Sequence, residues 1–320
     1  MKGKSKIQLA LWALLFMVAI PISAYGVDGQ IKIAQTAGTT FPITINESGS
    51  YVLTSNLIVA TGNAININAD NVTLDLNGHG IYGPGTGTGK GISAVNRYNI
   101  TIKNGIVRGF SFGIYLYNDA DHKGAGHRIE GIQASNNGSL GIYTYCSTVV
   151  TNCTANNNGS DGITAYPGTV TNCTANRNGA FGIYAMDSTV TNCTANNNGS
   201  YGIYASYSTV TNCTANYNGS DGITAYYSTV TNCTANDNDR DGIYVGDSTA
   251  TNCTANYNGS DGIYVGDSTV KGCNMRWNTG WGINMRTNYH NYIYRNAAGG
   301  NTAGQIYCPN GNTCVDNATF

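Results

Sequence analysis

Apolar side chains recur with a fixed period of 20 residues through the second half of the chain. Within one period, residues 162 to 181, the positions assigned to the interior are Ile163, Ala165, Val170, Cys173 and Ala175. They alternate with polar residues in short runs, as a strand with one buried face requires. A period of this length has no room for a pair of helices. It predicts a solenoid in which each repeat is one turn of three short strands and their corners.

Three further features of the repeat indicate where it bends. The odd spacing from Val170 to Cys173 breaks strand alternation, so we expect a corner near Asn172. Gly162 and Gly179 are expected to supply backbone freedom at the other corners. An asparagine at one fixed position is expected to form an internal hydrogen-bonded ladder, which comprises Asn158, Asn178, Asn198, Asn218, Asn238, Asn258 and Asn278.

The first half of the chain has no strict period but uses the same short β-prone runs, closed by Gly and Asn. Examples lie at 50–53, 64–67, 72–76, 100–102 and 113–116. Most alternate apolar and polar residues and therefore predict strands with one buried face. A leucine-rich repeat is the competing architecture at this period, but it needs a leucine framework, and no leucine follows Leu140.

The stretches ADNVTLDLNGHGIYG (69–83) and NITIKNGIVRGF (99–110), with the recurring GSDGI, resemble the right-handed parallel β-helix repeat family. The resemblance extends over about residues 51 to 294. It implies an all-β fold consisting of a single right-handed parallel β-helix. The repeat length predicts about 11 turns and a rod about 50 Å long. Because the family contains pectate-lyase-like enzymes and many other exported bacterial proteins, the resemblance indicates the fold and not the activity.

The chain is expected to divide into five segments. Residues 1–26 read as an export signal, with Lys2, Lys4 and Lys6 before an apolar run, and the mature chain is expected to start near Val27. Residues 27–49 and 295–320 are expected to cap the two open ends, since an uncapped stack exposes strand edges. Between them lie irregular turns (50–139) and regular turns (140–294). No later apolar run has the length of a membrane span, so an exported monomer at the cell surface, outside the cell or in the periplasm is expected.

Composition excludes one class of partner. The formal net charge is −1 and only 10% of residues are charged, which leaves no basic surface for nucleic acid. Asn, Thr, Gly and Tyr are abundant instead, and these residues suit turns, strands and hydrogen bonding on an uncharged surface.

The cysteines form a column with the 20-residue period, at Cys153, Cys173, Cys193, Cys213, Cys233, Cys253 and Cys273. Four interpretations remain open: buried thiols that act as small hydrophobic residues, disulfides between neighbouring turns, a metal site, or an outward-facing column. The first is favoured, since free cysteine is among the most buried residue types. Cys308 and Cys314 are expected to form a disulfide that closes a small loop, and Cys146 has no assigned role.

A tyrosine column follows the core isoleucines and predicts an outward aromatic surface. Its members are Tyr143, Tyr184, Tyr204, Tyr244 and Tyr264, interrupted by Thr164 and Thr224. Tyrosine combines an apolar ring with a hydroxyl and so suits sugar binding, although it is also an ordinary exposed strand residue. Two sets of aspartates lie beside this column, Asp161, Asp221, Asp241 and Asp261, and Asp187, Asp247 and Asp267. Ca²⁺ binding is one interpretation of them, and solvated corners are the favoured one.

Two other surfaces offer alternative functions. Thr169 and Thr171 recur in later turns as a flat grid that resembles the Thr-x-Thr faces of ice-binding β-solenoids. The irregular charged loop at 119–130 carries a candidate acid, base and cation for polysaccharide cleavage, within the set Asp119, Asp121, His122, Lys123, His127, Arg128 and Glu130. No motif of the family's enzymes matches these residues one by one.

The near-identical turns favour a non-catalytic function. Catalysis needs distinct residues that converge at one place, whereas tandem duplication yields extended, repetitive surfaces. The sequence therefore predicts an exported β-helix that binds a polysaccharide or cell-surface glycan, or acts as a structural or adhesive rod, without a required cofactor. A polysaccharide lyase or glycoside hydrolase using the 119–130 loop is the first alternative, and ice binding is the second.

Overall fold

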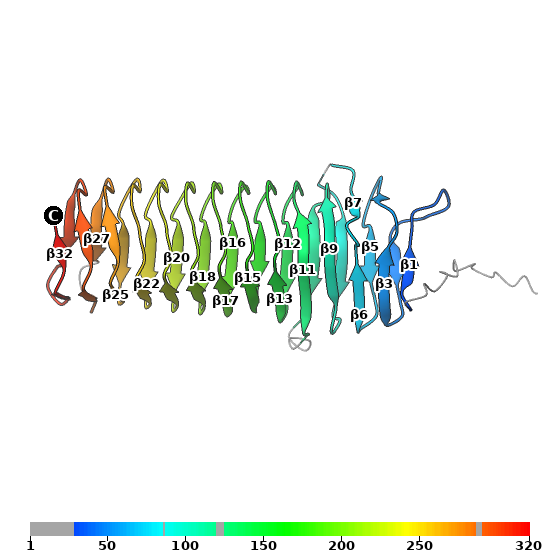
Figure 1. Ribbon diagram of the computed structural model, residues 1–320, viewed down its shortest axis with the longest axis horizontal. Coiled ribbons are helices and arrows are strands. Elements are labelled where there is room, and N and C mark those ends of the chain that lie inside the picture. Colours follow the sequence, from blue (N-terminus) through cyan, green and yellow to red (C-terminus); the bar gives the residue numbers. More distant parts are fainter. Residues whose placement is uncertain (1–28, 86, 120–124, 286–289) are drawn as a thin grey trace, which may run out of the picture.

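The computed structural model describes residues 29–85, 87–119, 125–285 and 290–320, and every regular element within them is a β-strand. The strands stack along one axis into an elongated rod (Figure 1). Each strand pairs with the equivalent strands of the turns before and after it, and all of these pairs are parallel. The predicted export signal at 1–26 lies outside the described residues. None of the described residues belongs to a helix long and apolar enough to cross a membrane.

One side of the rod is a sheet of 13 parallel strands, which we call the tyrosine sheet. Its strands, in spatial order, are β2 (Ile43–Ile45), β5 (Ile65–Ile67), β8 (Lys90–Val95), β10 (Phe112–Tyr117), β12 (Ile142–Tyr145), β14 (Ile163–Ala165), β16 (Ile183–Met186), β18 (Ile203–Ser206), β20 (Ile223–Tyr226), β22 (Ile243–Gly246), β24 (Ile263–Gly266), β27 (Trp281–Met285) and β30 (Gly304–Tyr307).

The second side, which we call the threonine sheet, has 16 strands. Its main path is β1 (Ile31–Ile33), β3 (Gly49–Leu53), β6 (Val72–Asp75), β9 (Thr101–Arg108), β11 (His127–Ala134), β13 (Thr148–Thr151), β15 (Gly168–Thr171), β17 (Ser188–Thr191), β19 (Thr209–Thr211), β21 (Thr229–Thr231), β23 (Thr249–Thr251), β25 (Thr269–Lys271), β28 (Tyr292–Tyr294) and β31 (Thr313–Val315). The short strands β4 (Leu57–Ile58) and β7 (Gly80–Tyr82) join this sheet through β9.

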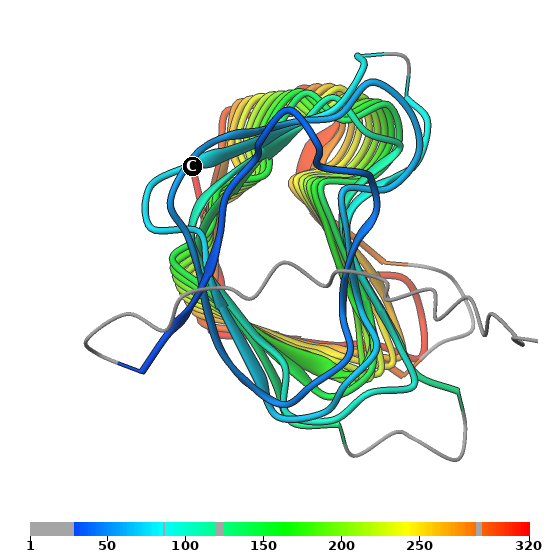
Figure 2. The same cartoon turned by 90° about the vertical axis from the view of Figure 1, so that its right-hand side faces the viewer.

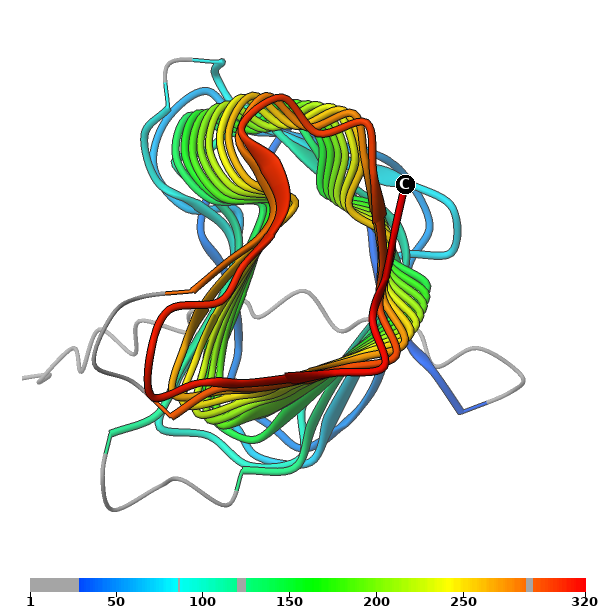
Figure 3. The same cartoon turned by 90° about the vertical axis from the view of Figure 1, so that its left-hand side faces the viewer.

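The third side is the narrowest. Near the C-terminus it is a separate sheet, in which β26 (Asn274–Arg276), β29 (Ala297–Gly299) and β32 (Ala318–Thr319) pair. Toward the N-terminus β4, β7 and the second halves of β9 and β11 pair along the same side. In the regular turns, single parallel bridges from Thr154 through Thr254 continue it. Seen along the axis, the regular turns superimpose, and the N-terminal turns carry loops that project beyond their outline (Figures 2 and 3).

The parallel solenoid predicted from the sequence is confirmed, with about two more turns than expected. The tyrosine sheet contributes one strand per turn and so counts 13 turns, against the predicted figure of about 11. The difference arises at the ends. The two stretches expected to be caps supply β1, β2 and β29–β32 to the ladders, so they extend the stack. With turns about 4.8 Å apart, the rod is about 60 Å long.

The predicted interior positions are all buried. Ile163, Ala165, Val170 and Ala175 are 0% exposed, and Cys173 is 1% exposed. Each stacks on its own equivalent one turn away, for example Ile163 on Ile183. The interior side chains form one continuous apolar cluster from end to end. The core therefore grows in length with each repeat, while its cross-section stays fixed by small Ala and Cys side chains.

The asparagine ladder is present and supports one corner from inside. Oδ1 of Asn178 accepts from both the backbone N–H and the side-chain Nδ2 of Asn158, each at 3.0 Å. Nδ2 of Asn178 donates in turn to the carbonyl of Ala155 at 2.9 Å and to Oδ1 of Asn198 at 3.0 Å. The same bonds recur through Asn278, so buried backbone groups at this corner are satisfied in every regular turn.

The corners use Asn and Gly differently from the prediction. Asn172 adopts a left-handed φ of 54°, as do its equivalents, which confirms the corner there. Gly162 and Gly179, however, have no left-handed φ. Glycine is required at Gly162 because a Cβ would lie 2.6 Å from Nδ2 of Asn178, and at Gly179 because a Cβ would collide with the carbonyl of Gly159. Close approach between turns, and not backbone freedom, therefore selects glycine at both positions.

The cysteine column faces the interior, as the favoured interpretation predicted. All seven of its members, and Cys146, are buried free thiols in the structure, and their sulfurs contact backbone carbonyls, as Cys173 Sγ does with the Thr171 oxygen at 3.2 Å. Burial raises the pKa of Cys146 to about 11. The hydrogen bond with Cys153, together with burial, raises the pKa of Cys173 to about 12. A disulfide joins Cys308 and Cys314.

Replacing Asn198 by Ala tests the ladder. The change removes the acceptor of the Asn178 N–H and leaves buried groups in two turns without partners, so we expect a loss of about 3 kcal/mol in the free energy of unfolding. The shift of the urea midpoint measures it. Thr189→Ala, at an exposed strand position, is the control and should change the free energy of unfolding by less than about 0.5 kcal/mol. Equal shifts in both variants would contradict the structural role of the ladder.

The state of the thiols is tested by alkylation and mass spectrometry. Since the eight free thiols are buried, the native protein should take up no alkyl group at pH 8. The unfolded, unreduced protein should take up eight, and the unfolded, reduced protein all 10. Fewer than eight in the second experiment would show that disulfides form along the column.

Candidate functional site

The tyrosine column lies on the outer surface of the tyrosine sheet. Because side chains alternate along each strand, Ile183 and Ala185 of β16 point inward and Tyr184 points outward. Tyr143, Tyr184, Tyr204, Tyr244 and Tyr264 are all half-buried and occupy equivalent positions in the ladder. The rings of Tyr184 and Tyr204 stack with centroids 5.2 Å apart and planes 4° apart. Burial raises the pKa of both hydroxyls, which therefore stay protonated at neutral pH.

The two threonine gaps in this column are filled by tyrosines from the next outward position. Tyr226 follows Thr224 by two residues within β20, and Tyr166 follows Thr164 by two residues, directly after the end of β14. The Tyr226 ring bridges its neighbours, with centroids 6.1 Å from Tyr204 and 5.2 Å from Tyr244, and lies against Gly246 of the next turn. The sequence contains this signal, because a tyrosine follows each of the two threonines by two residues, whereas Met, Ser or Gly stands at that position in the turns from Tyr184 onward that keep the tyrosine column.

The aromatic surface also continues into the less regular turns. Tyr115 stacks on Tyr143 with centroids 5.1 Å apart, and Tyr145 contacts Tyr166 at 4.8 Å. Along one edge, Phe181 packs against Tyr201 at 5.4 Å. We call this surface, which extends over β10 to β24, the aromatic face. No charged residue occurs in its strands β10, β12, β14, β16, β18, β20, β22 and β24.

The first set of aspartates is structural, and the expectation of solvated corners is wrong for three of its four members. Asp221, Asp241 and Asp261 are 3–5% exposed. Their carboxylates accept backbone N–H groups of the next turn, as Asp241 Oδ1 does from Asp261 N at 2.9 Å. Thr224 donates to Asp221 Oδ2 at 2.9 Å. Burial raises the pKa of Asp161, Asp221 and Asp261.

The second set of aspartates occupies exposed corners with left-handed backbone. Asp187, Asp247 and Asp267 have φ between 46° and 50°. Among the described residues no group of three or more His, Cys, Asp or Glu side chains is arranged to hold a metal ion.

The threonine grid faces outward on the threonine sheet. Thr169 and Thr171 of β15 pair in register with Thr189 and Thr191 of β17, and Val170 between them is buried. The same register continues through β19, β21 and β23. The flat grid inferred from the sequence is therefore present.

The structure divides the predicted catalytic loop. Asp121, His122 and Lys123 lie outside the described residues. Asp119 is held by Asn96, whose Nδ2 donates to Asp119 Oδ2 at 2.8 Å. His127 and Arg128 are neighbours on β11 and point to opposite faces: His127 is 2% exposed inside the solenoid, and Arg128 is exposed. The structure therefore does not bring this base and this cation together.

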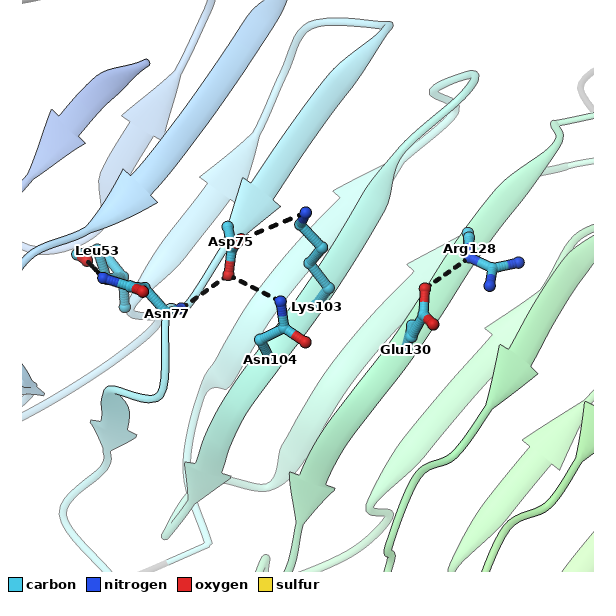
Figure 4. Close-up of polar contacts among 7 residues, drawn as sticks. All are labelled: Leu53, Asp75, Asn77, Lys103, Asn104, Arg128 and Glu130. Carbon is cyan, nitrogen blue, oxygen red and sulfur yellow. Dashed lines mark hydrogen bonds and ion pairs between the residues drawn. The ribbon is translucent and has the colours of Figure 1, made fainter. Parts of the chain in front are cut away.

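Arg128 and Glu130 belong instead to a charged patch on the outside of the threonine sheet (Figure 4). Arg128 Nε lies 2.9 Å from Glu130 Oε2, and Lys103 Nζ lies 3.3 Å from Asp75 Oδ2. Asp75, Lys103 and Glu130 occupy one column of the ladder. Asp75 also accepts hydrogen bonds from the backbone of Asn77 and from Nδ2 of Asn104. The charges pair with one another along the sheet surface.

His127 is a buried imidazole with one orphaned nitrogen. Its Nδ1 accepts the backbone N–H of Ile100 at 3.0 Å, so this nitrogen is unprotonated, and Nε2 has no hydrogen-bond partner. Burial lowers the pKa of His127 to about 4. The ring is thus a neutral structural acceptor.

Acidification should destabilise the protein through His127. The histidine pKa is 6.5 in the unfolded chain and about 4 in the folded one, so its contribution is complete above pH 6.5 and is lost as the pH falls toward 4. The loss is about 3 kcal/mol. Unfolding midpoints measured from pH 7 to 4 should fall less steeply in His127→Asn than in wild type. His79→Asn is the control, and an unchanged slope in His127→Asn would contradict the assignment.

Comparison with known proteins agrees with this architecture. The family model described as right handed beta helix region matches residues 43–208 and 187–268. A search of curated proteins found no significant match.

Similar solved structures include two A-modules of Azotobacter vinelandii mannuronan C-5 epimerases. AlgE6 has 16% identity and a TM-score of 0.52, with 91% of this chain and 89% of that chain covered. AlgE4 has 16% identity and a TM-score of 0.50, with 85% and 87% covered. A variant of the periplasmic alginate epimerase AlgG has 11% identity and a TM-score of 0.55, with 85% and 77% covered. At these identities the likeness concerns the fold. The family match spans well over half of the sequence, and the chain belongs to the right-handed β-helix family.

Proposed function

We propose that the protein is an exported, non-catalytic rod that binds an extended polysaccharide along the aromatic face. The observation that carries the proposal is the continuity of that face: tyrosine rings from successive turns follow one another from Tyr115 to Tyr264, and where one column lacks a ring the other supplies it. Half-buried tyrosine rings and their hydroxyls offer apolar contact and hydrogen bonding together, which is what sugar rings require.

The charge of the face favours a neutral glycan. Strands β10 to β24 of the tyrosine sheet contain no lysine or arginine. Lys90 of β8 reaches the N-terminal end of the face, where its Nζ lies 3.4 Å from the centroid of the Tyr115 ring. Beyond that end, a chain of uronic acids would find no counter-charge on these strands. The names of the similar structures refer to mannuronan and alginate, and they describe those proteins and not this chain. Here the repeated ring spacing, 5.2 Å for Tyr184–Tyr204 and 5.4 Å for Tyr244–Tyr264, suits a polymer that lies parallel to the rod axis.

Two alternatives have direct tests. A polysaccharide lyase or glycoside hydrolase would release new sugar ends from a panel of plant, algal and bacterial polysaccharides with calcium present. The opposite orientations of His127 and Arg128 count against a site built on that pair. Ice binding through the threonine grid would appear as thermal hysteresis that Thr211→Tyr abolishes.

The aromatic face is tested with the double variant Tyr184→Ala, Tyr204→Ala. Removal of two stacked rings should weaken binding to a neutral polysaccharide such as cellulose or chitin by about tenfold or more, since each ring contributes roughly 1 kcal/mol. Depletion isotherms on the insoluble polymers measure the change.

Thr211→Tyr, which alters the threonine sheet, is the matched control and should bind as wild type does. The proposal fails if the wild-type protein releases sugar ends, or if the double variant binds every polymer with unchanged affinity.

A further inference from the structure

A second aromatic group lies at the corner where the chain leaves the tyrosine sheet for the threonine sheet. The corner residue has a left-handed backbone in five successive turns, with φ between 46° and 50°, at Asp187, Tyr207, Tyr227, Asp247 and Asp267. Asp and Asn tolerate this conformation, whereas for a bulky residue it is an outlier that costs of the order of 1 kcal/mol.

Neither the backbone nor the core accounts for the two tyrosines at this corner. Tyr207 is 59% exposed and Tyr227 is 54% exposed, so their rings gain little from burial. An aspartate fills the same corner in three other turns. Residues that cost stability and remain exposed are candidates for function.

The two rings form a short stack that ends at a groove. The Tyr207 and Tyr227 centroids are 4.9 Å apart with planes 7° apart, so the rings stack along the rod axis. The next turn carries Asp247 at this corner, and no ring of the described residues stacks on the far face of Tyr227. An open groove of about 480 Å³ begins there and runs past Asp247 and Asp267 to His290. The groove is largely open to solvent.

The groove has a closed floor and polar walls. Ser228, Ser248 and Ser268 form the floor, and their hydroxyls donate to carbonyls two residues earlier at 2.6–2.7 Å. The exposed carboxylates of Asp247 and Asp267 stand above it. At the far end the backbone N–H of His290 donates to Asp267 Oδ1 at 3.0 Å. The acceptors that the groove offers a ligand are the carboxylate oxygens of Asp247 and Asp267 and the hydroxyls of the lining threonines.

We propose that this groove binds a single neutral pyranose ring of a glycan, with one sugar face stacked on the free face of Tyr227 and sugar hydroxyls donating to Asp247 and Asp267. Carboxylates accept strong hydrogen bonds from hydroxyl groups and repel the carboxylate of a uronic acid. Among the described residues that line the groove there is neither lysine nor arginine. The site goes beyond the proposed function, because it lies at a different corner and uses none of the residues of the aromatic face.

The decisive variant is Tyr227→Asn, which places at this corner a residue that prefers left-handed backbone. Its melting temperature should equal or exceed that of wild type, so a loss of binding would not reflect unfolding. Tyr217→Asn is the matched control: Tyr217 is 59% exposed with φ 57° at another corner, away from the groove. The probes are a neutral β-1,4-linked glucose trimer and a galacturonate trimer, titrated by calorimetry.

We expect wild type and Tyr217→Asn to bind the neutral trimer and not the galacturonate trimer, and Tyr227→Asn to bind the neutral trimer at least tenfold more weakly. The double variant Tyr184→Ala, Tyr204→Ala should keep the part of the trimer binding that Tyr227→Asn removes. A wild type that ignores the neutral trimer, or a Tyr227→Asn variant that binds it normally, overturns the groove site and leaves the aromatic face untouched. Loss of trimer binding only in the double variant assigns it to the aromatic face and likewise overturns the groove.

Discussion

The stacking of each turn directly on the next constrains every residue of this protein. At the spacing of paired parallel strands, a side chain has its own equivalent as nearest neighbour on both sides. Only residues that pack favourably against copies of themselves can occupy a regular column. Isoleucine does so in the core, threonine on the open sheet, asparagine through amide hydrogen bonds, and tyrosine through ring stacking. A column of like charges would repel, which explains why charged residues make up only 10% of the chain.

The aspartates and the cysteines show how residues that pack less favourably against their own equivalents are accommodated. Asp221, Asp241 and Asp261 stack although they are buried, because each carboxylate accepts the backbone N–H of the following turn. Burial raises the pKa of Asp221 and Asp261, which shows that the site disfavours their charge. The cysteines are small, apolar and able to contact carbonyls, so the column fills the interior without widening the turn.

The same constraint decides what could be predicted from the sequence. The strict period makes each column recognisable in the sequence. The interior set Ile163, Val170 and Cys173, the corner at Asn172 and the asparagine ladder could therefore be predicted. Features that depend on contacts between columns could not. The steric need for Gly162, the burial of Asp221 and the bridging position of Tyr226 each involve a neighbour from another turn or another column. The end turns carry no strict period, so the strands that they add to the ladders could not be counted from the sequence.

The residues that depart from the period are therefore the most informative about function in the regular turns. A column that repeats faithfully is explained by stacking alone, whereas a residue that fits its column poorly needs another reason. Tyr207 and Tyr227 occupy left-handed corners where aspartate stands in other turns, and they remain exposed. Thr164 and Thr224 interrupt the tyrosine column, yet the rings reappear beside them. The rings therefore continue across these substitutions, so the aromatic surface does not depend on the residues of any single column.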